Sequence, residues 1–225
     1  KTAYMLTAQN TSLPMTTVTA SYYALAGITA ADSADAIWID AKVADKSLPM
    51  GMKVCLQAGM IMPEASITTD TTAMGMKVSA KPMPALTLSG AFTFVSGNTD
   101  GKHQAAVKNT GTGVKSPLFT QMVYNQDAIS LDAKTVVVKG AYSLGDMGTV
   151  IGQYGFTDGG RLNLMNAGRQ SGTDYSEFDL MYKVKAGGVQ YFAAFINRSW
   201  SEPTSIEAGS MDSDNKIRVW GRYAF

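Results

Sequence analysis

The chain has little of what most binding and catalytic sites are built from, with one cysteine, Cys55, and one histidine, His103, in 225 residues. A single cysteine excludes an internal disulfide, and one cysteine with one histidine gives no zinc-ligand spacing. Long hydrophobic runs are also lacking, because the longest uncharged stretch, residues 15–31, is rich in Thr and Ser. A membrane-spanning helix needs about 20 predominantly apolar residues. If the chain lies in a membrane, it must therefore cross as a closed β-barrel, the other fold that satisfies its backbone hydrogen bonds in lipid.

Charge is scarce as well. Asp, Glu, Lys and Arg make up 16% of the residues, against roughly 25% in soluble domains. The net charge of +1 gives no reason to propose a nucleic-acid partner. The 22 glycines and 10 tyrosines favour a protein of many short strands whose surface is not entirely in contact with water.

Alternation with a period of two residues is the main pattern that is present, and it predicts strands with one apolar face. It is clearest in the final segment, where one face carries Ile217, Val219, Gly221, Tyr223 and Phe225 and the other carries Lys216, Arg218, Trp220, Arg222 and Ala224. The same pattern occurs in 36–43, 51–61, 85–94, 133–144 and 175–184, and less cleanly in 2–9, 15–26, 72–81, 147–157 and 188–200. We therefore expect an all-β antiparallel sheet of about 11 strands, each close to the roughly 9–11 residues of a spanning strand.

The expected connections alternate between short and long, as in outer-membrane barrels with short periplasmic turns and long external loops. The short connections are 10–14, 45–50, 81–84, 145–146 and 186–187, and the long ones are 27–35, 62–71, 95–132, 158–174 and 201–214. An odd number of strands conflicts with the even numbers of single-chain bacterial barrels. Either the count is wrong by one, or residues 1–225 are the C-terminal part of a larger barrel, which is the interpretation we favour.

Three segments carry a resemblance to a known family. The closing run 216–225, ending in Phe225, looks like the last strand of outer-membrane proteins, and the stretches 115–129 and 175–183 are similar to segments of the major outer-membrane porins of Campylobacter-type bacteria. The resemblance covers the second half of the chain well and the first half loosely. It implies a homotrimeric barrel of about 18 strands, moderately cation-selective, with calcium in the pore, although no calcium ligand can be assigned to a residue of this chain.

This interpretation predicts a single barrel region over 1–225, a passive channel for ions and small hydrophilic solutes in a bacterial outer membrane. Lys or Arg at mid-membrane costs about 2–4 kcal/mol when it faces lipid, so the charged face should line the pore. The predicted pore-lining residues are Asp40, Lys42, Lys53, Lys77, Lys134, Lys139, Glu177, Asp179, Lys183, Lys216, Arg218 and Arg222, and the predicted lipid-interface aromatics are Tyr182, Tyr223 and Phe225. This pore-lining set is markedly basic and, taken alone, favours anions.

The long loop 95–132 exceeds the roughly 12–15 residues beyond which uncommitted loops are usually functional or disordered. Its front, 97–113, is rich in Gly, Asn and Lys, and its back, 117–129, is more apolar. The back half is therefore expected to fold toward the pore and narrow it. The alternative is an exposed surface loop.

Catalysis and metal binding have weak support. His103 lies in the Gly-rich part of the long loop, without the rigid support that an oriented catalytic histidine needs. Glu177 and Asp179 could serve acid–base chemistry, but pore-lining charge is the simpler interpretation. The run Asp212–Asn215 begins like a calcium loop but lacks the glycine and glutamate of that motif. The sequence therefore predicts no enzyme and no cofactor. The remaining alternatives are a non-channel barrel, such as an adhesin or structural protein, and a soluble β-sandwich binding module.

Overall fold

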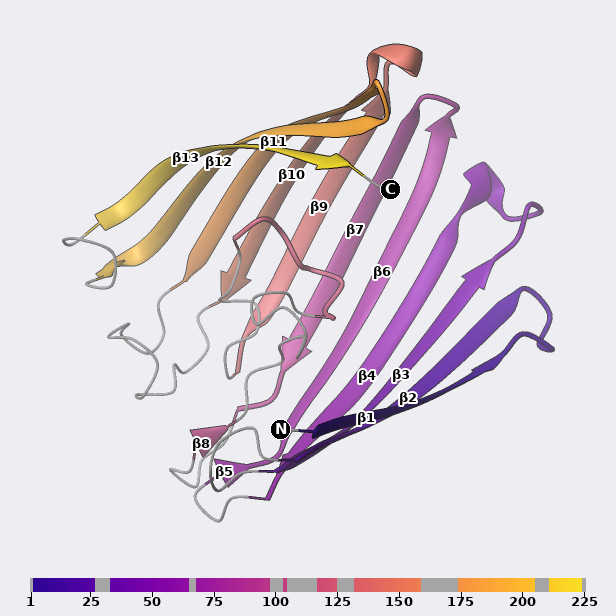
Figure 1. Ribbon diagram of the computed structural model, residues 1–225, viewed down its shortest axis with the longest axis vertical. Helices are drawn as coiled ribbons and strands as arrows, with labels where there is room; N and C mark the ends of the chain where they lie inside the picture. Colours follow the sequence, from indigo (N-terminus) through magenta and orange to yellow (C-terminus); the bar gives the residue numbers. More distant parts are fainter. Residues whose placement is uncertain are drawn as a thin grey trace.

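The computed structural model describes residues 2–26, 33–64, 68–97, 103–104, 117–124, 132–158, 174–204 and 211–223. In these residues it consists of one antiparallel sheet of eleven strands and a two-stranded parallel pair, β5–β8. The main sheet is strongly curved, so that its first and last strands both lie in front of its middle (Figure 1). None of the helices in the described residues is long and apolar enough to cross a membrane.

The strands of the main sheet pair in chain order from β1 to β13. They are β1 (Thr2–Asn10), β2 (Thr16–Ala26), β3 (Ala34–Ala44), β4 (Lys53–Pro63), β6 (Thr71–Met83), β7 (Leu86–Val95), β9 (Lys134–Ser143), β10 (Thr149–Asp158), β11 (Tyr175–Ala186), β12 (Val189–Thr204) and β13 (Met211–Tyr223). The remaining elements are β5 (Thr68–Thr69), β8 (His103–Gln104) and the 3₁₀ turns η1 (Pro49–Gly51) and η3 (Gly145–Met147).

The alternation in the sequence therefore predicts the fold class correctly. All eleven expected strands are present, within a few residues of the expected bounds, and every neighbouring pair of the main sheet is antiparallel. A single continuous sheet is not the two packed sheets of a sandwich, so the soluble β-sandwich alternative is wrong. Among the described residues β1 and β13 are not paired with each other, so the eleven strands form an open sheet.

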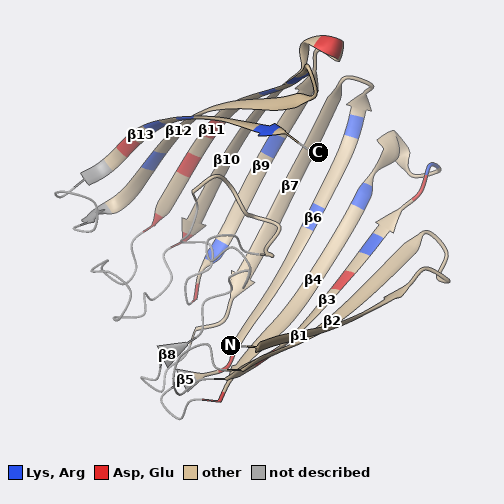
Figure 2. Ribbon diagram, viewed as in Figure 1, with Lys and Arg blue, Asp and Glu red and all other residues tan. Residues whose placement is uncertain are grey.

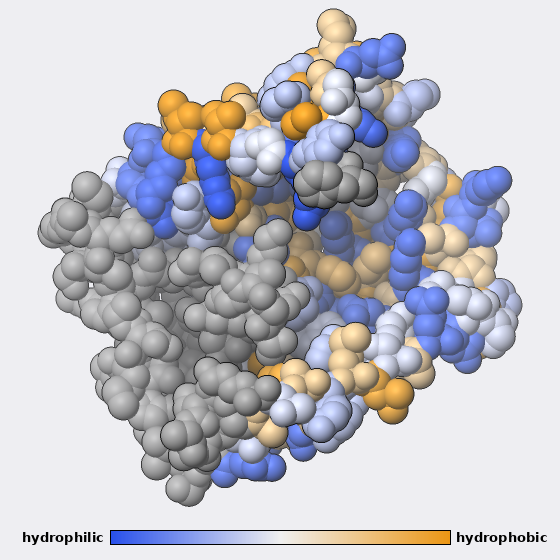
Figure 3. Space-filling view, viewed as in Figure 1, coloured by the Kyte–Doolittle hydropathy of each residue, from blue (hydrophilic) through white to orange (hydrophobic). Residues whose placement is uncertain are grey.

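The two faces of the sheet differ in chemistry because successive side chains point to opposite sides. The outward rows are apolar and exposed, as with Ile37 and Ile39 on β3 and Val136 and Val138 on β9. The inward rows face the concave side and carry most of the buried polar residues, including Gln57 and Gln153. Hydrophilic residues with some hydrophobic ones between them are visible in the hollow of the molecule (Figure 3). This distribution, with apolar side chains outside and polar side chains inside, is the reverse of that in a soluble protein.

The short turns show local chemistry suited to tight hairpins. Gly187 and Gly188 join β11 to β12 with φ of 56° and 80°, and two consecutive positive φ angles are what a two-residue hairpin turn requires. In the turn after β3, the carboxylate of Asp45 accepts a hydrogen bond from the backbone N–H of Ser47 at 2.8 Å. That hydrogen bond holds the pKa of Asp45 below its usual value.

The glycines of the inward rows make room for side chains of the same chain. A Cβ on Gly59 would overlap the ring of Trp38, and a Cβ on Gly75 would stand 2.8 Å from a methyl carbon of Thr93. Trp38 belongs to a small apolar cluster on the concave side, with Ala73, Val95 and Leu118. Glycine weakens a strand, so its presence beneath Trp38 marks a close packing contact.

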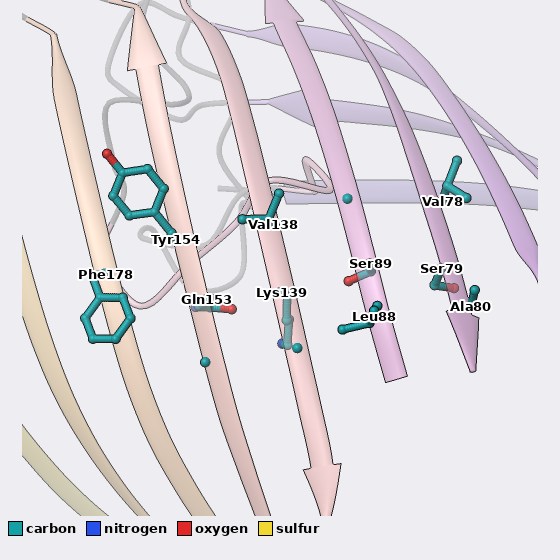
Figure 4. Close-up of a pocket in the computed structure, with 13 residues that line it drawn as sticks. Val78, Ser79, Ala80, Leu88, Ser89, Val138, Lys139, Gln153, Tyr154 and Phe178 are labelled. Carbon is teal, nitrogen blue, oxygen red and sulfur yellow. The ribbon is translucent and has the colours of Figure 1, made fainter. Parts of the chain in front are cut away.

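Glycines of the outward rows have no such neighbour. A Cβ on Gly90 or Gly152 would have no atom of the chain within 4 Å. Together with Gly140 they line a hollow of about 620 Å³. Leu88, Tyr154 and Phe178 also line it (Figure 4). A side chain at position 90 would therefore not disturb the packing within the chain.

We predict that Gly59→Ala destabilises the folded protein by about 1–3 kcal/mol, the usual cost of overpacking, because Trp38 must leave the surface of the strand. Gly90→Ala is the matched control and should change the unfolding midpoint little. The midpoint can be followed by tryptophan fluorescence during denaturant unfolding in detergent. Equal effects of the two substitutions would contradict the packing described here.

Candidate functional site

The candidate site is an eight-residue segment, 117–124, which we call the strap. It is the described part of the back half of the loop between β7 and β9, and it lies across the concave face of the sheet (Figure 1). Its contacts begin at β3 and β4 and end at β12 and β13. The strap is not part of a strand, and it contains a turn in which Gln121 N donates a hydrogen bond to the carbonyl of Leu118 at 3.1 Å. Buried backbone groups outside such a turn need partners on the wall.

The first half of the strap is anchored on β4 and β7. The side chain of Gln57 accepts a hydrogen bond from Phe119 N at 2.9 Å and donates one to the carbonyl of Pro117 at 3.3 Å. The hydroxyls of Thr93 and Thr120 lie 2.6 Å apart. Leu118 packs into the apolar cluster of Trp38, Ala73 and Val95. This end therefore combines apolar burial with three hydrogen bonds.

The middle of the strap rests on β10. Met122 is buried, and its sulfur occupies the space where a Cβ of Gly155 would stand, next to Val137. Methionine suits such a gap because its side chain is unbranched and flexible. As at Gly59, a side chain occupies the space next to an inward glycine.

The second half is held by two carboxylates of β11. Glu177 Oε1 accepts a hydrogen bond from Tyr124 N at 2.8 Å, and Asp179 Oδ2 accepts one from Val123 N at 3.3 Å. Asp179 Oδ2 also accepts one from Gln153 Nε2 at 2.6 Å, and the hydroxyl of Tyr175 donates to Glu177 Oε2. This end is therefore fixed by hydrogen bonds to two buried carboxyl groups, whereas the first end is also held by the apolar packing of Leu118.

Cations surround the end of the strap. The ring of Tyr124 lies beneath Arg198, Lys216 and Arg218, at 4.9, 5.0 and 5.7 Å from its centroid. Arg198 forms a bidentate pair with Asp214, whose Oδ2 also lies 3.3 Å from Lys216 Nζ. Cation–aromatic contacts contribute about 0.5–2 kcal/mol each, depending on desolvation.

Most of the charges predicted to line a pore lie on the concave side. The alternation places nine of them on inward rows, where Figure 2 shows cationic segments on β4, β6, β9 and β13: Asp40, Lys42, Lys53, Lys77, Lys139, Lys183, Lys216, Arg218 and Arg222. Lys139, for example, lies opposite Ser89 on one side and Gln153 on the other.

Three of the predicted residues differ from the prediction. Glu177 and Asp179 point inward but have 1% and 0% of their surface exposed, because the strap covers them. They hold the strap and do not line open space. Lys134 lies on the outward row with Val136 and Val138, at the long-loop end of β9, where its Nζ is 3.9 Å from Asp158. A position at the strand end lets an outward lysine stay hydrated, with 54% of its side chain exposed.

The predicted interface aromatics lie outward where the structure describes them. Tyr223 is exposed on β13, and Tyr182 on β11 donates a hydrogen bond to the carbonyl of Met147 in the turn η3. Phe225 lies outside the described residues, as does the side chain of His103.

Several residues of the site were not predicted. They are Gln57, Thr93, Gln153, Tyr175 and Arg198 on the wall, and Tyr124 on the strap. Arg198 lies on an inward row that also carries Ala194, Ile196 and Trp200, all buried. This mixture hides the alternation on β12, although Arg198 was the only charge in that predicted strand.

The calcium that the family resemblance implies stays a prediction for this chain. Calcium takes 6–8 oxygen ligands, whereas no group of three or more His, Cys, Asp or Glu side chains in the described part of the chain could hold a metal ion. The oxygens of Glu177 and Asp179 are already bonded to the strap, Tyr175 and Gln153, with Asp179 Oδ1 as the exception among the described residues.

Comparison with solved structures identifies the fold. Pseudomonas aeruginosa OccK11 (OpdR) superposes with a TM-score of 0.70 at 12% identity, over 98% of this chain and 57% of that one. Acinetobacter baumannii OccAB2 gives 0.61 at 14% identity, over 97% and 55%. The outer membrane protein OprD of Pseudomonas aeruginosa gives 0.60 at 11%, over 96% and 67%.

The fold is that of an outer-membrane β-barrel. The chain spans just over half the length of the first two of these proteins, and its open sheet superposes on that portion of them. No protein-family model and no curated protein matches the sequence. The neighbours support a general porin fold and are not Campylobacter-type porins.

The strap's first anchor generates a prediction. Gln57→Leu removes both hydrogen bonds to the strap and leaves Phe119 N without its acceptor, which costs about 1–3 kcal/mol. Hydrogen exchange measured by mass spectrometry should become faster in peptides covering 117–124. Cys55→Ala, on the same inward row of β4, is the control and should leave that exchange unchanged. If Gln57→Leu also leaves the exchange of 117–124 unchanged, the anchor is not needed to hold the strap.

Proposed function

We propose that the chain forms part of the wall and the constriction of an outer-membrane porin, a channel rather than an enzyme, through which ions and small hydrophilic solutes diffuse passively. The observation that carries the proposal is the strap, fixed across the concave face of a sheet whose other face is apolar and exposed. In lipid, such a sheet buries its outward rows in hydrocarbon and encloses water on its inward side.

The strap is the proposed constriction. It occupies part of the lumen while leaving cationic side chains beside it, and both ends are bonded to the wall. Selectivity in such channels comes from pore diameter and from rings of charged side chains. The strap affects both the diameter and the charge of the lumen, because it takes up space and covers the two carboxyl groups of β11.

The charge of the lumen is proposed to be asymmetric. Of the nine inward charges identified above, eight are Lys or Arg, on β3, β4, β6, β9, β11 and β13, and one is an acid, Asp40. Asp214, which is also inward, is paired with Arg198 and Lys216. The family resemblance implies a moderate preference for cations. We propose that acidic groups of further strands or loops face this basic wall and produce a transverse field across the constriction.

The cellular setting follows from the same proposal. We place the protein in the outer membrane of a Gram-negative bacterium, with its outward rows in contact with lipid. The segments resembling Campylobacter-type porins support a barrel of about 18 strands that assembles as a homotrimer. A non-channel barrel, such as an adhesin with a plugged lumen, is the competing function, since the strap already fills part of the lumen.

Reconstitution of the intact protein into planar lipid bilayers tests the proposal. We expect stepwise increases in conductance that rise with salt concentration, because ions cross a water-filled lumen. The folded state can be checked separately by the change in electrophoretic mobility that heating causes in a folded barrel. If folded protein inserts into the bilayer but gives no conductance, the non-channel barrel is favoured.

Charge reversal tests the assignment of the basic wall. Arg218→Glu with Arg222→Glu should shift the reversal potential in a KCl gradient toward cation preference, because both side chains lie on an inward row of β13. Lys134→Glu is the control and should leave the potential unchanged, since Lys134 lies on the outward row. Equal shifts for the double variant and for Lys134→Glu would contradict the assignment.

A further inference from the structure

Three cations on one aromatic ring is an unusual arrangement, because like charges repel unless acids lie between them. Arg198, Lys216 and Arg218 all lie within about 6 Å of the Tyr124 ring centroid, the range of cation–aromatic attraction. They come from two neighbouring strands, β12 and β13, whereas Tyr124 comes from the strap. The ring is therefore the point where the end of the strap meets the cationic wall.

The acidic side chains near this ring already have hydrogen-bond or ion-pair partners. Asp214 pairs with Arg198 and Lys216. Glu177 accepts hydrogen bonds from Tyr124 N and the hydroxyl of Tyr175, and Asp179 accepts them from Val123 N and Gln153. Among the described residues no ion pair is found for Arg218. Its guanidinium instead lies between two rings, 5.7 Å from the Tyr124 centroid and 5.4 Å from the Trp220 centroid.

An aromatic ring attracts a cation through its quadrupole and carries no net charge. A carboxylate in the place of the ring would gather the same cations but cancel one of their charges. Tyr124 gathers them and leaves the local field positive. At the same time, its backbone N–H on Glu177 fixes where the ring lies.

The contacts continue beyond Arg218. Trp220 stacks on Phe192 with centroids 4.9 Å apart and planes 4° from parallel, and Lys183 lies 5.5 Å from the Phe192 centroid. A continuous series of ring and cation contacts thus runs along the inward rows of β11, β12 and β13, starting from the strap. A change at Tyr124 would act on the first of these cations.

We propose that Tyr124 is a positioning and specificity-determining residue of the channel, which holds the end of the strap in place and keeps a positive field beside it that favours the passage of anions over cations. The inference rests on the proposed function. It is a statement about relative permeability, so it holds whatever the overall preference set by the rest of the lumen.

The test uses three substitutions in the intact protein and a KCl gradient across a planar bilayer. Tyr124→Leu removes the ring, Tyr124→Phe keeps it without the hydroxyl, and Phe195→Leu removes a ring on the exposed outward row of β12, away from the strap. We expect Tyr124→Leu to lower the chloride-to-potassium permeability ratio roughly threefold, the scale of one lost cation–aromatic contact. Tyr124→Phe and Phe195→Leu should keep the original ratio.

A series of phenylalanines with increasing fluorination at position 124 guards against misfolding of the leucine variant. Fluorine weakens the ring's attraction for cations with little change in size, so the ratio should fall step by step along the series. A ratio that stays constant along the series, or a shift with Phe195→Leu equal to that with Tyr124→Leu, overturns the role of Tyr124. Absence of conductance in the unsubstituted protein would instead contradict the proposed channel itself.

Discussion

The structure depends on one constraint, that a strand sends alternate side chains to opposite faces while its backbone groups bond to its neighbours. Eleven strands with this alternation in register produce one face that is apolar and another that carries the charges. The curvature of the sheet turns that second face inward (Figure 1). Only a segment placed on the inward side, as the strap is, can use the charged rows as hydrogen-bond partners.

The strap illustrates how buried polar groups are tolerated. Removing two carboxyl groups from water is costly unless hydrogen bonds replace the lost hydration. Glu177 and Asp179 receive backbone N–H groups of the strap, and the strap in turn has no strand to pair with. The strap therefore supplies the donors that the two carboxyl groups need, and the carboxyl groups supply acceptors for the backbone of the strap. The opposite end is held differently, by Gln57 and by the packing of Leu118 against Trp38.

The sequence was sufficient for the strands because their pattern is local. The period of two is visible within each segment, and it places Lys42 or Arg218 on the inward side without knowledge of the rest of the chain. It could not reveal that Glu177 and Asp179 are covered, because the cover comes from residues more than 50 positions earlier. Arg198 was missed because its row also packs buried apolar residues, and Lys134 was misplaced because the alternation was not applied to the strand end.

Neighbouring residues on β4 offer the most direct test of the central claim, that the inward side faces water and the outward side faces hydrocarbon. Cys55 lies on the inward row with Gln57, and Leu56 lies on the outward row. In bilayers, a charged water-soluble thiol reagent should modify Cys55. It should not modify a cysteine introduced by Leu56→Cys in a Cys55→Ser background, whereas a lipid-soluble reagent should. Modification of both positions by the charged reagent, or of position 56 alone, would contradict the account.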